Sequence, residues 1–135
     1  MANTVTQQII EDGKKNTIIK FFISGDGSGE ETNYTLFDAS AYITESTNNR
    51  LRKICYNLNG FDAVLYWDAT LNVPIISLDE GLQEEVDFFK YGGSLINNAG
   101  AGKTGNILIT TTGLGAGDEG YLILHINQRK VPKER

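Results

Sequence analysis

The alternation of short β-prone runs with glycine-containing turns is the feature that most constrains the fold of this chain. The runs are rich in Thr, Ile, Val and Tyr, and the 135 residues include 15 Gly but only 2 Pro. β-branched and aromatic side chains favour strands, and glycine allows the tight reversals between them. A helical pattern competes only at QEEVDFFK, and no internal repeat is visible. We therefore predict an all-β fold, an antiparallel β-sandwich or jelly-roll-like domain of about eight short strands.

Turn dipeptides and loop composition divide the chain into strands. Asp-Gly and Asn-Gly between β-prone runs are strong hairpin signals. The two predicted hairpins are residues 4–10 with 16–23 around Asp12-Gly13, and residues 51–59 with 61–68 around Asn59-Gly60. Further strands are predicted within residues 34–42, 73–78, 84–93, 106–112 and 121–127, and residues 24–33 are an expected exposed loop. Pro74 cannot donate a ladder hydrogen bond, so we expect it at the start of its strand or in an edge strand. The last two strands, joined by residues 113–120, are expected to form a central, well-buried pair.

Strict alternation gives the two middle strands one apolar face each. The predicted apolar faces consist of Ile54, Tyr56 and Leu58 on the first strand and of Phe61, Ala63, Leu65 and Trp67 on the second. Side chains in a strand point alternately to opposite sides, so both faces must be covered by another layer. Two sheets are implied.

Size, charge and cysteine content limit the class of protein. We predict a single β-sandwich domain over residues 1–135 that ends in a short basic tail, residues 128–135. The net charge of -5 argues against a nucleic-acid partner. The N-terminus lacks the features of a secretion signal, and no apolar run is long enough for a membrane span, so we expect a cytoplasmic protein without a membrane partner. Cys55 is the only cysteine, which excludes a disulfide within the chain and favours a buried, inert thiol.

Residues 100–105, GAGKTG, resemble the end of a phosphate-binding P-loop. The motif requires a glycine where this chain has Asn97, and it must lead into a helix, whereas here it leads into the predicted strand NILITTT. Without a helix N-terminus the anion site is missing. We interpret the segment as a connection between strands.

Residues 26–31, DGSGEE, resemble the start of a calcium-binding loop. An EF-hand is excluded because Glu31 replaces the required glycine and Phe37 replaces the bidentate glutamate. A looser calcium site within residues 24–33 stays open as an alternative to a plain solvated loop.

Two other patterns suggest chemistry and have simpler explanations. His125 is the only histidine, and nothing in the sequence activates Cys55 as its partner in a catalytic dyad. Trp67 beside Tyr66 and Asp68 is compatible with a sugar-stacking platform, but its alternation with Leu65 places it in the core. We predict no enzymatic activity, no catalytic residue, no metal site and no cofactor.

Seven segments in a characteristic order extend over almost the whole chain, namely TVTQQIIEDGKKNTIIKFF, GDGSGEET, FDAS, LYWDAT, VPII, KYGGSLINNAGAGKTGNILITTTG and YLIL. Their order resembles a family of small virion structural proteins of tailed bacteriophages, of the capsid (head) decoration type. LYWDAT, NAGAGKTG and LITTTG are the most specific parts of these segments. No catalytic or ligand residues come with this family.

The resemblance implies a virion location and a non-enzymatic decoration or cement role, after synthesis in the host cytoplasm. The partner would be the major capsid protein or another virion protein, bound in many copies of a homo-oligomer within a symmetric assembly. Candidate interface residues fall in two groups, the N-terminal strand with Thr4, Thr6 and Gln8 and the basic tail with Arg129, Lys130, Lys133 and Arg135. A carbohydrate-binding β-sandwich module is the alternative function.

Overall fold

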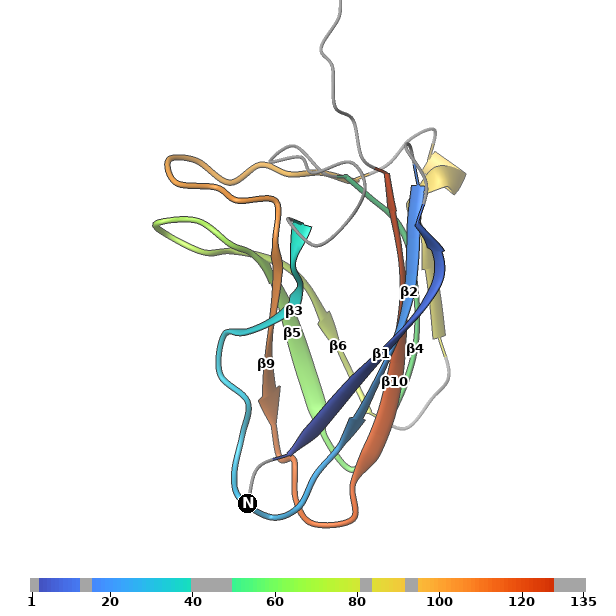
Figure 1. Cartoon of the computed structure of the whole chain (residues 1–135), viewed down its shortest axis with the longest axis vertical. Helices are drawn as coiled ribbons and strands as arrows, with labels where there is room; N and C mark the ends of the chain where they lie inside the picture. The colour runs from blue at the N-terminus through green and yellow to red at the C-terminus, as the bar shows by residue number, and fades with distance from the viewer. Residues whose placement is uncertain (1–2, 13–15, 40–49, 81–83, 92–94, 128–135) are drawn as a thin grey trace, which may run out of the picture.

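The chain forms two antiparallel β-sheets that pack face to face (Figure 1). A computed structural model describes residues 3–12, 16–39, 50–80, 84–91 and 95–127. The first sheet has the order β1 (Thr4–Asp12), β2 (Asn16–Ser24), β10 (Glu119–Asn127), β4 (Arg50–Asn59) and β7 (Glu84–Asp87), and β8 (Leu95–Ile96) also pairs with β4. The second sheet has the order β3 (Tyr34–Phe37), β9 (Ile107–Thr112), β5 (Asp62–Trp67) and β6 (Val73–Leu78). The predicted all-β sandwich is confirmed.

Alternating apolar residues of both sheets fill the space between them. The predicted faces of β4 and β5 are buried, and so are alternate residues of β2, β9 and β10. The largest fully buried side chains are Trp67, Phe21, Phe37 and Phe61, which are surrounded by Ile and Leu residues of both sheets. Burial of such apolar surface is the main stabilising contribution to a fold of this size.

The connection at Asn59-Gly60 differs from the predicted hairpin. β4 pairs with β10 and β7 in the first sheet, whereas β5 pairs with β9 and β6 in the second, so the turn crosses from one sheet to the other. In a hairpin, β4 and β5 would be neighbours in one sheet. Their placement in opposite sheets turns the two apolar faces toward each other and buries both, which explains the difference.

The strand pairing of the first predicted hairpin is confirmed, because β1 and β2 pair antiparallel from Thr4 opposite Ser24 onward. Gly13 of its predicted turn lies outside the described residues. The last two strands are central as predicted, but β9 and β10 lie in different sheets and do not pair with each other. Pro74 lies in β6, an edge strand, as expected. The segment in which helix and strand compete contains both, since β7 continues into a short 3-10 turn, η2 (Phe88–Tyr91).

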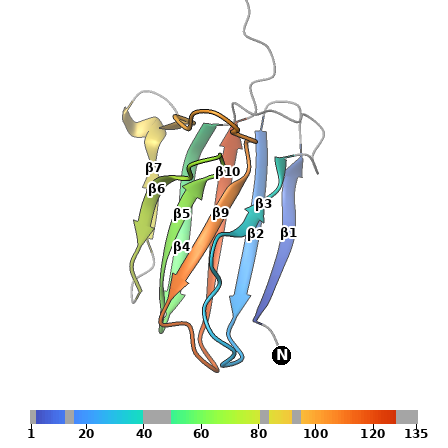
Figure 2. The ribbon, with the colours of Figure 1, turned by 90° about the vertical axis from the view of Figure 1, so that its left-hand side faces the viewer.

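The strand order leaves β1 at one side of the sandwich and β6 and β7 at the other (Figure 2). β1 pairs with β2, and no other described strand lies beside its second edge. The described part of the chain contains no helix long and apolar enough to cross a membrane.

Candidate functional site

The predicted interface residues of the N-terminal strand lie together on the outer face of β1. Thr4, Thr6 and Gln8 are exposed, and they stand opposite Ser24, Phe22 and Lys20 of β2. The strand forms here because its β-branched residues pair in register with the equally β-prone β2. The other predicted interface residues, Arg129, Lys130, Lys133 and Arg135, lie outside the described residues.

The inner face of β1 is only partly covered. Val5 packs against the core, but Ile9 on the same face is 50% exposed although it stands opposite the fully buried Ile19. The next residue, Ile10, lies at a bulge and is 57% exposed. Large apolar side chains at this level of exposure on a free sheet edge are typical of an interaction surface.

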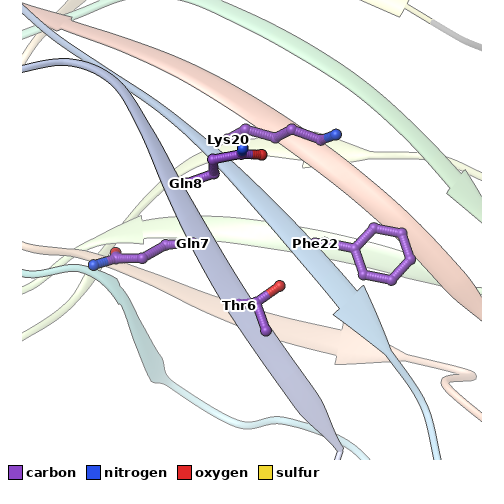
Figure 3. A pocket seen from close by; sticks show the side chains of 5 residues that line it. All are labelled: Thr6, Gln7, Gln8, Lys20 and Phe22. Atoms are coloured by element: carbon purple, nitrogen blue, oxygen red, sulfur yellow. The ribbon is translucent and has the colours of Figure 1, made fainter.

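A shallow hollow lies beside this strand on the outer face of the first sheet. Thr6, Gln8, Lys20 and Phe22 point to this face from β1 and β2, whereas the side chain of Gln7 points to the other side of the strand (Figure 3). The hollow has a volume of about 80 Å³. Ligand pockets usually have about 300–1,000 Å³, so the hollow is better suited to contact with another protein surface.

Aromatic side chains continue this face across the sheet. Phe22, 37% exposed, stands directly opposite the partly exposed Tyr121 of β10. The Lys20 ammonium lies 5.9 Å from the centre of the Tyr121 ring, close enough for a cation–π interaction. Ile123, the next outward-facing residue of β10, is also only partly buried. Lys20, Phe22 and Tyr121 therefore form a strip across β2 and β10 that combines apolar and polar groups, as protein–protein interfaces do.

An ion pair borders the strip on the side of β7. The Lys53 Nζ lies 3.0 Å from Glu85 Oε2, and the Cys55 thiol lies 3.5 Å from the same oxygen. Burial, and then the Glu85 carboxylate, raise the pKa of the Cys55 thiol. A raised pKa keeps the sulfur protonated at neutral pH, and the thiolate is the reactive form. The thiol is thus partly buried rather than fully buried, and its surroundings do not activate it.

The Gly-Lys-Thr segment is hydrogen-bonded into the connection between β5 and β6. The backbone N–H groups of Lys103 and Thr104 donate to the carbonyl oxygens of Gly100 and Asp68. The Thr104 hydroxyl donates to Asp68 Oδ2 at 2.8 Å. A P-loop needs such amides pointing at a phosphate. The segment leads into β9, so the interpretation as a strand connection is confirmed.

The acidic loop holds its neighbouring loop in place. Glu30 accepts hydrogen bonds from the Thr111 hydroxyl and from the backbone N–H groups of Gly113 and Leu114, at 2.7–3.1 Å. The Thr111 hydroxyl also accepts from the Glu31 N–H, and Glu31 accepts from the Asn3 side chain. The described residues contain no group of three or more His, Cys, Asp or Glu side chains placed to hold a metal. These carboxylates serve to connect the N-terminus, the loop after β2 and the loop after β9.

The Glu30 carboxylate gives a testable pH dependence. The hydrogen bond from Thr111, and then those from the backbone, lower the pKa of Glu30. A lowered folded-state pKa stabilises the fold fully above the unfolded value near 4.3, and the effect disappears as pH falls through the folded value. We expect Glu30→Gln to lower the free energy of unfolding by about 1 kcal/mol at pH 7, a modest loss because water screens the exposed carboxylate. The difference from wild type should shrink below about pH 4 in urea titrations. Glu119→Gln, at an exposed strand position, is the control; an equal loss in both variants would contradict this assignment.

Two remaining candidates are accounted for by the packing. Trp67 is 1% exposed in the core, as its alternation with Leu65 predicts, so it offers no surface for a sugar. His125 is partly buried on the outer face of β10, opposite Ile18 and Lys53. The sequence did not reveal the strip formed by Lys20, Phe22 and Tyr121, because only the register of β2 and β10 brings these residues together.

No protein-family model matches the chain, and no curated protein matches it. One similar solved structure is a cupin superfamily protein from Desulfitobacterium hafniense DCB-2, with 18% sequence identity and a TM-score of 0.33. That match covers 95% of this chain and 80% of the other.

Proposed function

We propose that this chain is a non-enzymatic structural component of a tailed-phage particle, bound in many copies to the capsid or to another virion protein. The proposal rests on the sequence resemblance described above and on one structural observation, the exposed edge strand β1 beside the partly apolar strip of the first sheet. Ile9, Ile10 and Phe22 expose apolar surface there, and the hollow that Phe22 helps to line, about 80 Å³, is small for a ligand pocket. Such a surface suits contact with another protein.

The residues and motifs that suggested other activities are explained by contacts within the fold, and this favours a structural role. The Gly-Lys-Thr segment and Glu30 make hydrogen bonds within the fold, and the thiol of Cys55 has a raised pKa. The alternative of a carbohydrate-binding module depended on Trp67 at the surface, and this side chain is buried. Many copies of a rigid sandwich, each with one modest interface, would together bind a particle strongly through multivalency.

Co-sedimentation with capsids that lack the chain tests this proposal. We expect the purified protein to bind saturably, and Phe22→Ser to weaken binding by about tenfold because it removes an aromatic side chain from the strip. Leu71→Ser is the matched control, since Leu71 is 82% exposed on the turn between β5 and β6, away from the strip. Failure of the wild-type protein to sediment with capsids, or equal weakening by both substitutions, would contradict the proposal.

A further inference from the structure

The free edges of the two sheets differ in how well they are protected against pairing. β7 has three acidic residues among its four, β6 contains Pro74, and β3 is only four residues long. Charges, proline and short length are the usual devices that prevent edge-to-edge pairing. β1 is nine residues long, and its residues from Thr4 to Ile10 include no charge and no proline. Among the described strands, β1 is therefore the edge best suited to accept another strand.

We propose that β1 pairs antiparallel with β1 of a second copy, about a two-fold axis at Gln7. This inference rests on the proposed function, in which many copies lie side by side on a particle. In this register Val5 of one copy faces Ile9 of its partner, and Thr6 faces Gln8. The first sheets of the two copies would join into one continuous sheet.

The distribution of charge favours a second copy as the occupant of this edge. The net charge of -5 makes copies repel one another unless their carboxylates stay apart. In the antiparallel arrangement, positions 11 and 12 of the two copies lie at opposite ends of the pair, and the central residues from Thr4 to Ile10 are neutral. Pairing through the β7 edges would instead bring carboxylates of both copies together, which is destabilising.

On both faces of the proposed contact, side chains of one copy meet side chains of matching chemistry from the other copy. On the inner face, Ile9 is half-exposed in one copy and would gain the aliphatic neighbour Val5 of the other. On the outer face, Thr6 and Gln8 would make a polar pair, flanked by Phe22 and Lys20 from the two β2 strands. The hollow in each copy would lie next to the hollow in its partner, so the strip continues across the two-fold axis.

Charge swapping tests this register. We expect sedimentation velocity of the wild-type protein to shift from a 14.8 kDa monomer toward twice that mass with increasing concentration. A small interface predicts that this shift falls between about 10 μM and about 1 mM. Thr6→Glu with Gln8→Glu places like charges opposite each other and should raise the dissociation constant at least about tenfold, and so should Thr6→Lys with Gln8→Lys. Thr6→Lys with Gln8→Glu places opposite charges across the axis and should keep the dimer.

The two like-charge variants change the net charge in opposite directions, so their shared loss cannot come from general repulsion. Both positions are exposed, and an unchanged melting temperature will show that each variant is folded. A wild-type protein that stays monomeric throughout, or variants that all dimerise alike, would overturn the self-pairing. Capsid co-sedimentation is read separately, so a monomer that still binds capsids removes only the self-pairing and leaves the proposed function standing.

Discussion

Replacing Trp67 with alanine is expected to lower the free energy of unfolding by about 3–5 kcal/mol, a large part of the stability of a small domain. The side chain is 1% exposed and is among the largest in the core. It lies on β5 between Ile107 of β9 and Val73 of β6, so its removal leaves a cavity lined by both neighbouring strands. Urea unfolding followed by circular dichroism measures the loss.

Tyr66→Ala is the matched control for this substitution. Tyr66 is an aromatic residue of the same strand, but it points to the other side of the sheet and is partly exposed. Its replacement should cost about 1 kcal/mol or less. If Trp67→Ala is as stable as the wild-type protein, the indole lies at the surface, and the carbohydrate-binding alternative is open again.

Replacing Gly25 with alanine should also destabilise the fold, by about 2–3 kcal/mol, because there is no room for a side chain. A Cβ atom at this position would lie 2.2 Å from the backbone oxygen of Gly115. The backbone of Gly25 donates to the Asp118 oxygen at 2.8 Å and accepts from the Gly117 N–H at 3.1 Å. The end of β2 and the loop before β10 must therefore move apart, and both hydrogen bonds weaken.

Gly115→Ala provides the comparison, since its Cβ would meet only the Asp118 carboxylate at 3.5 Å, an ordinary contact. We expect this variant to retain nearly all of its stability. The two proteins should be compared by thermal and urea unfolding at one pH. If Gly25→Ala is as stable as Gly115→Ala, the end of β2 and the loop before β10 do not lie as close together as the structure shows.

The alternation of side chains was sufficient to predict the two faces of each major strand. Ile54, Leu58 and Leu65 are buried as their positions indicated, and Cys55 and Asn57 lie on the outer side of β4. The period of two is a local property of the backbone, so it can be read from one strand at a time. This is why the fold class and the core could be predicted from the sequence.

Strand partners could be predicted only for β1 and β2, which are adjacent in sequence. Asn59-Gly60 is compatible with a hairpin, but its flanking strands lie in different sheets. β10 pairs with β2 and β4, which are both far from it in sequence. Such pairings depend on how all the apolar faces are buried together, and a turn dipeptide does not contain that information.

The candidate site was predictable only where it follows a single strand. Thr4, Thr6 and Gln8 share one face of β1 by simple alternation, and the structure places them there, exposed. The strip of Lys20, Phe22 and Tyr121 requires the register between β2 and β10. The exposure of Ile9 and Ile10 depends on the position of β1 at the edge of its sheet.

The central proposal, that this chain is a virion component, is tested most directly by quantitative mass spectrometry of purified particles of a tailed phage whose genome contains this sequence. We expect the chain to stay with the particles through density-gradient purification, at a copy number that is a fixed fraction of the copy number of the major capsid protein. Symmetric attachment of many copies requires such a ratio. Absence of the chain from the particles, or a trace amount that varies between preparations, would contradict the proposed virion role.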